Sequence, residues 1–166
     1  MSRCVVDTNV AIVANGRPDP GDLRPPSVSC QKAAVTFLID LERNGTVLLD
    51  VEGAIQREYH RHLEPSGQPG IGDRFYQEVL RSSPRLVERV DLPKLPDGEY
   101  ENLPRPLIDS GFDPSDRKFA ALANRENVPV FNAIDSDWIE HAAILAIAEI
   151  QVENLCGCDT EQWFAA

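Results

Sequence analysis

The sequence predicts an α/β fold in which a parallel sheet is covered by helices on both faces. Short runs of valine and leucine alternate with segments whose apolar residues recur at helical spacing. Such alternation is typical of parallel sheets, because a crossover helix must join each strand to the next. The 166 residues, 42% apolar and 26% charged, fit a single domain spanning residues 1–166. The proline-rich stretches near 16–28 and 64–109 are interpreted as insertions within it.

The first half of the chain is predicted to form two strand–helix pairs. Residues 3–7 are a short apolar run, and a loop follows because residues 16–26 contain four prolines and two glycines. A helix is expected at 29–44, where alanine, phenylalanine and leucine recur at helical spacing before a glycine. The run at 46–51 predicts a strand, and the pattern at 54–63 predicts the second helix.

The second half continues the alternation. Residues 73–81 carry aromatic and aliphatic residues at helical spacing, and residues 86–92 alternate between apolar and charged, as half-exposed strands do. Asp113 and Pro114 are typical of a helix start. A helix, a strand, a helix and a last strand are then predicted at 117–125, 128–132, 138–147 and 150–155.

The charge of the chain limits its partners. A net charge of −11 argues against a broad basic face for nucleic acid. It is compatible with a nuclease whose acids surround metal ions, and it favours a localised substrate footprint or a basic protein partner.

The sequence contains no membrane or export signal that we recognise. No run approaches the roughly 18 apolar residues that span a bilayer, and an acid follows the first two valines. We therefore expect a cytoplasmic protein with no membrane partner. Its four cysteines are expected to be thiols rather than a disulfide framework, with Cys4 in the core.

Acidic residues follow two of the predicted strands. Asp7 comes directly after Val5 and Val6, and Asp135 and Asp137 follow the strand at 128–132. Because the carboxyl ends of parallel strands open onto one crevice, these carboxylates are expected to meet. Close like charges disfavour ionisation unless a cation neutralises them, and Mg²⁺ or Mn²⁺ prefers oxygen ligands. The pattern predicts a metal-dependent phosphodiesterase.

Each acid also has a structural interpretation. Asp7 can cap a turn or helix, and Asp116 can stabilise the first turn of the helix that follows it. Of Asp135 and Asp137, one is expected to bind metal and the other to cap a helix, with Asp135 favoured as the ligand. Glu58 alone would be a solvated helix residue, and Glu52 is its rival for a place in the site.

The order and context of these acids resemble the PIN domain. The resemblance spans the chain from the first strand to about Leu155, and four motifs carry it: Val5-Val6-Asp7-Thr8-Asn9, Glu58-Tyr59, Asp116 with the helix after it, and Asp135-Ser136-Asp137-Trp138. It implies a Rossmann-like α/β fold in which three or four acids bind Mg²⁺ or Mn²⁺ and cleave RNA. Many members are the toxins of bacterial toxin–antitoxin pairs, so the resemblance also implies a basic antitoxin and a homodimer as candidate partners.

The resemblance assigns roles to individual residues. Asp7, Glu58 and Asp116 would be catalytic metal ligands, and Asp135 or Asp137 would complete the site. Thr8 or Asn9 would support it by hydrogen bonding. Basic residues near the acids would guide the RNA backbone, namely Arg57, His60, Arg61, Arg117 and Lys118.

Two other functions compete with the ribonuclease. An aspartate-dependent phosphatase also has an acid after its first strand, but it requires a second aspartate where this chain has Asn9, and a lysine after a late strand. The other alternative is a catalytically inactive PIN-like scaffold that binds proteins.

Overall fold

The sheet is built from five short strands that all run parallel. In the computed structural model, which describes residues 3–165, their order across the sheet is β3-β2-β1-β4-β5. Their bounds are β1 (Arg3–Val6), β2 (Thr46–Asp50), β3 (Val87–Val90), β4 (Val130–Asn132) and β5 (Val152–Asn154). The predicted parallel α/β fold is confirmed.

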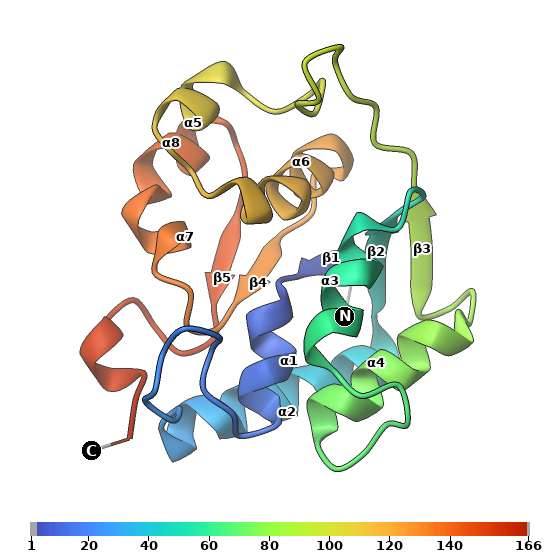
Figure 1. Ribbon diagram of the computed structural model, residues 1–166, viewed down its shortest axis with the longest axis vertical. Helices are drawn as coiled ribbons and strands as arrows, with labels where there is room; N and C mark the ends of the chain where they lie inside the picture. The colour runs from blue at the N-terminus through green and yellow to red at the C-terminus, as the bar shows by residue number, and fades with distance from the viewer. Residues whose placement is uncertain (1–2, 166) are drawn as a thin grey trace.

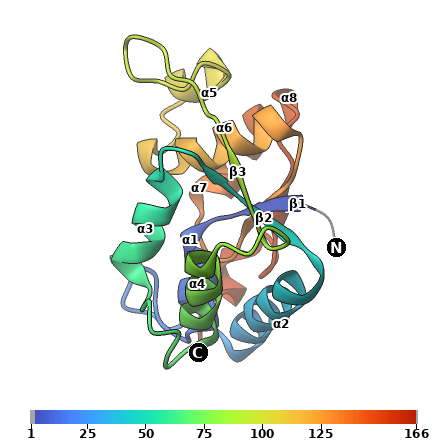
Figure 2. The same cartoon turned by 90° about the vertical axis from the view of Figure 1, so that its right-hand side faces the viewer.

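Residues 3–165 also form eight helices and two 3-10 turns (Figure 1). The helices are α1 (Thr8–Ala14), α2 (Val28–Asn44), α3 (Ala54–His62), α4 (Ile71–Arg81), α5 (Arg105–Asp109), α6 (Arg117–Glu126), α7 (Asp137–Glu140) and α8 (Ala142–Ile147). The 3-10 turns are η1 (Pro114–Asp116) and η2 (Thr160–Gln162). Helices α1, α2 and α4 pack together on one face of the sheet, and α6 contacts the other face (Figure 2).

Two helices are absent from the sequence-based prediction. Helix α1 follows β1 after one residue, and all seven of its residues are buried, so it has no amphipathic pattern to predict a helix from. Helix α5 lies in the proline-rich segment and begins after Pro104, with Pro106 in its first turn, where the missing N–H costs nothing. The helix predicted at 138–147 is interrupted at His141, which separates α7 from α8.

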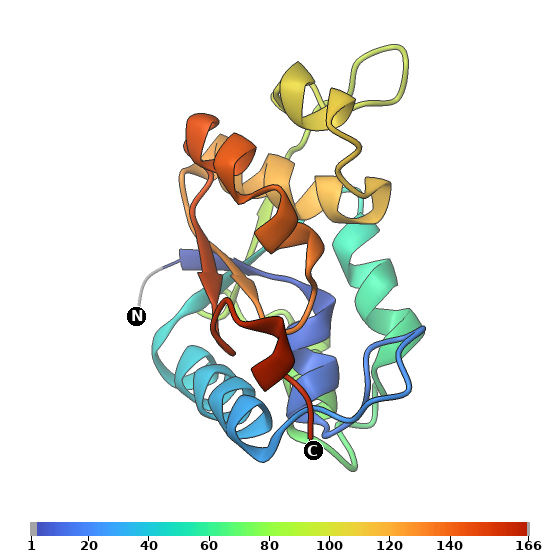
Figure 3. The same ribbon diagram turned by 90° about the vertical axis from the view of Figure 1, so that its left-hand side faces the viewer.

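The prediction that the cysteines are all thiols is wrong. Cys30, near the start of α2, forms a disulfide with Cys156, which follows β5 and lies 126 residues further along the chain. The C-terminal segment returns to the start of α2 (Figure 3). There the Ser27 N–H donates to the Trp163 carbonyl at 2.8 Å. The sequence cannot reveal this pairing, because only the tertiary fold brings the two cysteines together. Cys4 is buried in the core, as predicted.

The apolar core lies between the sheet and its helices. Its largest fully buried side chains are Trp138, Trp163, Tyr59, Tyr76 and Phe75. No helix within residues 3–165 is long and apolar enough to cross a membrane.

The strand order places a topological switch point between β1 and β4. The chain moves from β1 to β2 on one side of the sheet, whereas β4 and β5 lie on the other. Helices leaving the carboxyl ends of two such strands diverge and leave a crevice between them. Asp7 and the loop after β4 therefore face each other across this crevice.

Candidate metal centre

Three carboxylates meet at the carboxyl ends of β1 and β4. Asp7, Asp116 and Asp135 each offer an oxygen, and these three oxygens lie within 4.8 Å of one another. We call these three residues the cleft cluster. They line a cleft of about 280 Å³, and Asp7 is more than 100 residues from the other two along the chain. This spacing lets one cation contact all three side chains.

Asp7 is held rigidly at the end of β1. It is the N-cap of α1, where its Oδ1 accepts the Asn9 N–H at 3.2 Å. The Trp138 indole N–H donates to its Oδ2 at 2.7 Å. Burial raises the pKa of Asp7 to about 7, and the charges of Asp135 and Glu58 add to the shift. The capping role expected of Asp7 and its place in the cleft are thus compatible.

A buried amide network positions Asp135. The Asn9 side-chain oxygen accepts the N–H groups of Ala133 at 2.8 Å and Ile134 at 3.0 Å, which fastens the loop after β4 to α1. The Asn9 amide donates to Asn132 Oδ1 at 3.1 Å. Asn132 in turn accepts the Asp135 N–H at 3.1 Å and donates to the Asp135 carbonyl at 3.0 Å. Asn9 therefore supports the site through the loop rather than lying free for substrate.

Asp116 is the most exceptional member of the cleft cluster. It ends η1, is only 5% exposed, and its buried Oδ2 has no hydrogen-bond partner within residues 3–165. Burial raises the pKa of Asp116 far above its ordinary value, and the charges of Asp7 and Asp135 raise it further. Asp135 has a raised pKa for the same principal reason, its burial. A buried carboxylate oxygen without a partner is costly, so this oxygen points to a ligand.

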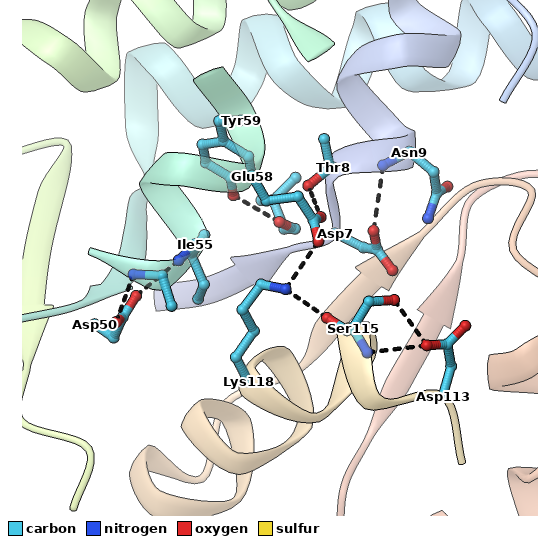
Figure 4. Close-up of polar contacts among 12 residues, drawn as sticks. Asp7, Thr8, Asn9, Asp50, Ile55, Glu58, Tyr59, Asp113, Ser115 and Lys118 are labelled. Carbon is cyan, nitrogen blue, oxygen red and sulfur yellow. Dashed lines mark hydrogen bonds and ion pairs between the residues drawn. The ribbon is translucent and has the colours of Figure 1, made fainter. Parts of the chain in front are cut away.

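Glu58 lines the same cleft but is already engaged by two neighbours (Figure 4). The Thr8 hydroxyl donates to its Oε2, and Lys118 Nζ lies 2.8 Å from its Oε1. Lys118 also donates to the Ser115 carbonyl at 2.5 Å. Glu58 thus connects α3 to α1 and α6 at the edge of the cleft cluster, and Lys118 places one positive charge there.

The overall fold resembles that of a solved structure. The crystal structure of VapBC2 from Rickettsia felis bound to a DNA fragment from their promoter aligns with 93% of this chain and 98% of the matched chain. The TM-score is 0.50 and the sequence identity is 18%. The chain has a PIN-like fold. No family model matches the sequence, and no curated protein matches it.

The donor set of this PIN-like domain fits a divalent cation. All the candidate ligand atoms in the cleft cluster are carboxylate oxygens, which hard cations prefer. A cation would supply the partner that Asp116 Oδ2 lacks, and its charge would favour the ionised form of three carboxylates whose pKa values burial raises.

Asp137 points away from the cleft of the PIN-like domain. Its Oδ2 accepts the Asp113 N–H at 2.9 Å, and its Oδ1 lies 3.0 Å from His141 Nδ1. Its own N–H donates to Asp135 Oδ1 at 2.9 Å, so it supports Asp135 through the backbone. Between the two sequence alternatives, the geometry brings Asp135 into the cluster. Glu52 is also elsewhere, since it lies 3.8 Å from Lys94 and does not line the cleft.

The basic residues expected beside the acids take different positions. Arg117 is largely buried, donating to the Phe112 carbonyl at 3.1 Å and pairing with Glu99 at 2.7 Å. It fastens the irregular segment before α6 and does not line the cleft. Arg57 and Arg61 line a separate hollow, together with His60. At about 100° per residue, Arg57 lies about 100° and Arg61 about 60° around the helix from Glu58, on the side toward this hollow.

The structure adds two cleft residues that sequence reasoning missed. Asp19, in the loop at 16–26, lines the cleft, and burial raises its pKa to about 6, with contributions from Asp135 and Asp22. His62 also lines it, one helical turn after Glu58. The spacing of His62 from Glu58 was a usable signal. A proline-rich loop gives no periodicity from which the direction of Asp19 can be read.

Proposed function

We propose that this PIN-like domain is a metal-dependent endoribonuclease that uses Mg²⁺ or Mn²⁺. The observation that carries the proposal is the buried Oδ2 of Asp116, which has no hydrogen-bond partner within residues 3–165. Asp116 also offers an oxygen that lies within 4.8 Å of oxygens of Asp7 and Asp135. Asp7, Asp116 and Asp135 would hold the cation. Glu58 and Asp19 would complete the acidic lining around it.

The proposed mechanism requires position and charge rather than covalent catalysis. When bound, the cation supplies the positive charge that polarises a phosphate oxygen and a water molecule. Trp138 and the Asn9 N–H fix both oxygens of Asp7, and the Asn9–Asn132 network fixes the loop that carries Asp135. Lys118 lies beside Glu58, where its ammonium can pair with the scissile phosphodiester. No serine or cysteine lies among the cleft acids except Ser115, which hydrogen-bonds Asp113 at 2.9 Å.

The partners of the proposed enzyme follow from its fold and charge. The VapBC2 likeness supports a protein partner of the antitoxin type, and the net charge of −11 favours one with a basic face. A homodimer is a further proposal, which light scattering can test. We infer that the protein acts on RNA in the cytoplasm. Because disulfides are rare there, the fold should persist when Cys30 and Cys156 are reduced.

The decisive experiment compares two aspartate-to-asparagine variants. The wild type should cleave single-stranded RNA in Mg²⁺ or Mn²⁺ and should stop when EDTA is added. Asp116→Asn keeps the side-chain size but removes the charge, so the cleavage rate should fall by roughly two to three orders of magnitude. Asp137→Asn is the matched comparison, because that carboxylate lies outside the cluster. It should retain cleavage within a few-fold.

Other outcomes would redirect the proposal. Equal rates for the wild type and Asp116→Asn would show that a contaminant cleaves the RNA or that the site lies elsewhere. A protein that binds no Mn²⁺ and cleaves none of a panel of structured and unstructured RNAs would instead be a scaffold.

A further inference from the structure

A second hollow lies on the opposite flank of α3 from the cleft cluster. It has a volume of about 780 Å³ and is formed by α3, the end of α4, β3 and the turn after β2. Three arginines line it, Arg57 and Arg61 from α3 and Arg89 from β3. We call it the arginine hollow.

The arginines of this hollow have no acidic partners. Within residues 3–165, six arginines make no ion pair with a carboxylate, namely Arg43, Arg57, Arg61, Arg85, Arg89 and Arg125. Three of these six, Arg57, Arg61 and Arg89, line this one hollow. Arg57 donates to the Glu52 carbonyl at 2.8 Å and Arg89 to Gln56 Oε1 at 2.7 Å, both uncharged acceptors. No acid is among the residues that line the hollow. A chain of net charge −11 therefore keeps a local positive site there, which suits an anionic ligand.

Helix α3 connects the arginine hollow to the proposed active site. Glu58 and His62, one turn apart, line the cleft, whereas Gln56 and His60 line the hollow. With about 3.6 residues per turn, the outer surface between these two flanks carries Arg57 and Arg61. A strand that leaves the cleft across α3 therefore meets two guanidinium groups before it reaches the hollow.

The walls of the hollow also offer apolar contact. Val51 is 56% exposed and Leu80 is 38% exposed, and both line it. Unpaired bases pack on apolar side chains and stack on guanidinium planes, while their phosphates pair with arginine. A duplex would keep its bases stacked inside and would leave these two side chains without contacts.

We propose that the arginine hollow binds the single-stranded RNA segment that emerges from the cleft over α3. This inference rests on the proposed ribonuclease function and adds a second binding site to it. An acidic peptide would satisfy the same charges, but only a continuous strand explains why the arginines of α3 lie between the hollow and the acidic cleft.

The test compares two double variants that each remove two exposed arginines. Arg57→Ala/Arg61→Ala removes the α3 arginines, and Arg43→Ala/Arg125→Ala removes two others near helix ends. Binding of labelled, unstructured RNA of about 4 to about 16 nucleotides, the range of single-strand site sizes, is measured by fluorescence anisotropy in EDTA. Melting temperatures check that both variants remain folded.

The α3 variant should bind the longer RNAs at least tenfold more weakly and the shortest ones about equally. Two lost phosphate contacts should also lower the slope of log K against log salt by about 1.4, at about 0.7 each. The control variant should match the wild type. Equal losses in both variants, no loss in either, or no RNA binding by the wild type would overturn the hollow as an RNA site. So would selective binding of poly-glutamate, which would indicate an acidic protein partner.

The two proposals can fail separately. Arginine-dependent RNA binding without any cleavage would reject the nuclease and keep the RNA site. Cleavage that depends on Asp116, with binding that is indifferent to Arg57 and Arg61, would keep the nuclease and reject the hollow.

Discussion

Two clusters of potential metal ligands lie close together in this molecule, and they differ in what their carboxylates contact. The cleft cluster is buried or nearly so, and one of its oxygens has no partner. The other, which we call the helix cluster, consists of Asp137, Glu140 and His141 near α7 and is more exposed. Asp137 in that cluster is satisfied by the Asp113 N–H and by His141. Unsatisfied burial, rather than the number of acids, therefore distinguishes a candidate functional site from a structural one.

The largest expected difference between the clusters is in metal-induced stability. A cation that binds only the folded state at a hundred times its Kd should add about 2.7 kcal/mol to the free energy of unfolding. Mn²⁺ should therefore raise the melting temperature of the wild type. Asp7→Asn or Asp116→Asn should abolish most of this rise, and Asp137→Asn should preserve it. Differential scanning fluorimetry with and without EDTA measures the shifts.

A reversed result would move the site. If Asp137→Asn removed the Mn²⁺ effect while Asp116→Asn kept it, the helix cluster would be the metal centre and the cleft cluster would be structural.

The next difference is in the pH dependence of stability without divalent cations. Asp7 has a pKa of about 7 in the folded protein against 3.8 as an ordinary aspartate. Because the pKa of Asp7 is raised on folding, its protonated form favours the folded state. This contribution to the free energy of unfolding is full below about pH 3.8 and is lost as the pH rises through about 7. In EDTA, the wild type should therefore unfold at lower urea concentration at pH 8 than at pH 5.

Substitutions should separate the two clusters by the sign of their effect at pH 8. Asp116→Asn replaces a carboxyl group that burial keeps protonated in the folded protein at pH 8 by a side chain that needs no proton, so it should raise the free energy of unfolding in EDTA by about 1–3 kcal/mol. Asp137→Asn replaces one of two satisfied acceptor oxygens by an NH₂ group, so it should lower the free energy of unfolding by about 1 kcal/mol. Urea titrations measure both. A loss of stability in Asp116→Asn would show that its carboxylate is not strained by burial.

The sequence predicted the cleft cluster, but it could not predict the contacts that set the helix cluster apart from it. Strand-end positions predicted that Asp7 and Asp135 meet, because parallel topology fixes where strand ends lie, and the PIN-like motif order added Asp116. The local sequence favoured Asp135 over Asp137 as the metal ligand but could not decide between them, because the two residues are two positions apart at the start of α7. That distinction depends on the Asp113 N–H, a contact made 24 residues away.

The features that the sequence mainly failed to predict are the directions of side chains on helices and the contacts between distant parts of the chain. Arg57 and Arg61 lie within three positions of Glu58 in sequence, but their places around the helix bring them to another hollow. Helix α1 was missed because its residues are all buried and show no amphipathic pattern. The Cys30–Cys156 bond joins residues that only the return of the C-terminal segment brings together.

The smallest expected effect concerns His141 in the helix cluster. Burial lowers the pKa of His141, but its hydrogen bond to the Asp137 carbonyl and the charge of Asp137 outweigh this, so the pKa is raised overall. Asp137→Asn keeps the carbonyl and removes the charge. The pKa of His141 should therefore fall by less than about one unit, since partly exposed pairs contribute about 0.2–1 kcal/mol. An NMR titration of the three histidines measures it, with Asp116→Asn as the control that should leave His141 unchanged.

The sign of this effect is fixed by linkage. A histidine with a raised pKa stabilises the fold fully below its ordinary pKa of 6.5, and it loses that contribution as the pH rises through the folded value. An unchanged His141 in Asp137→Asn would show that the carbonyl alone sets its pKa. Asp137 would then interact with the Asp113 N–H as a purely structural acceptor, which would widen the contrast with the charged cleft cluster.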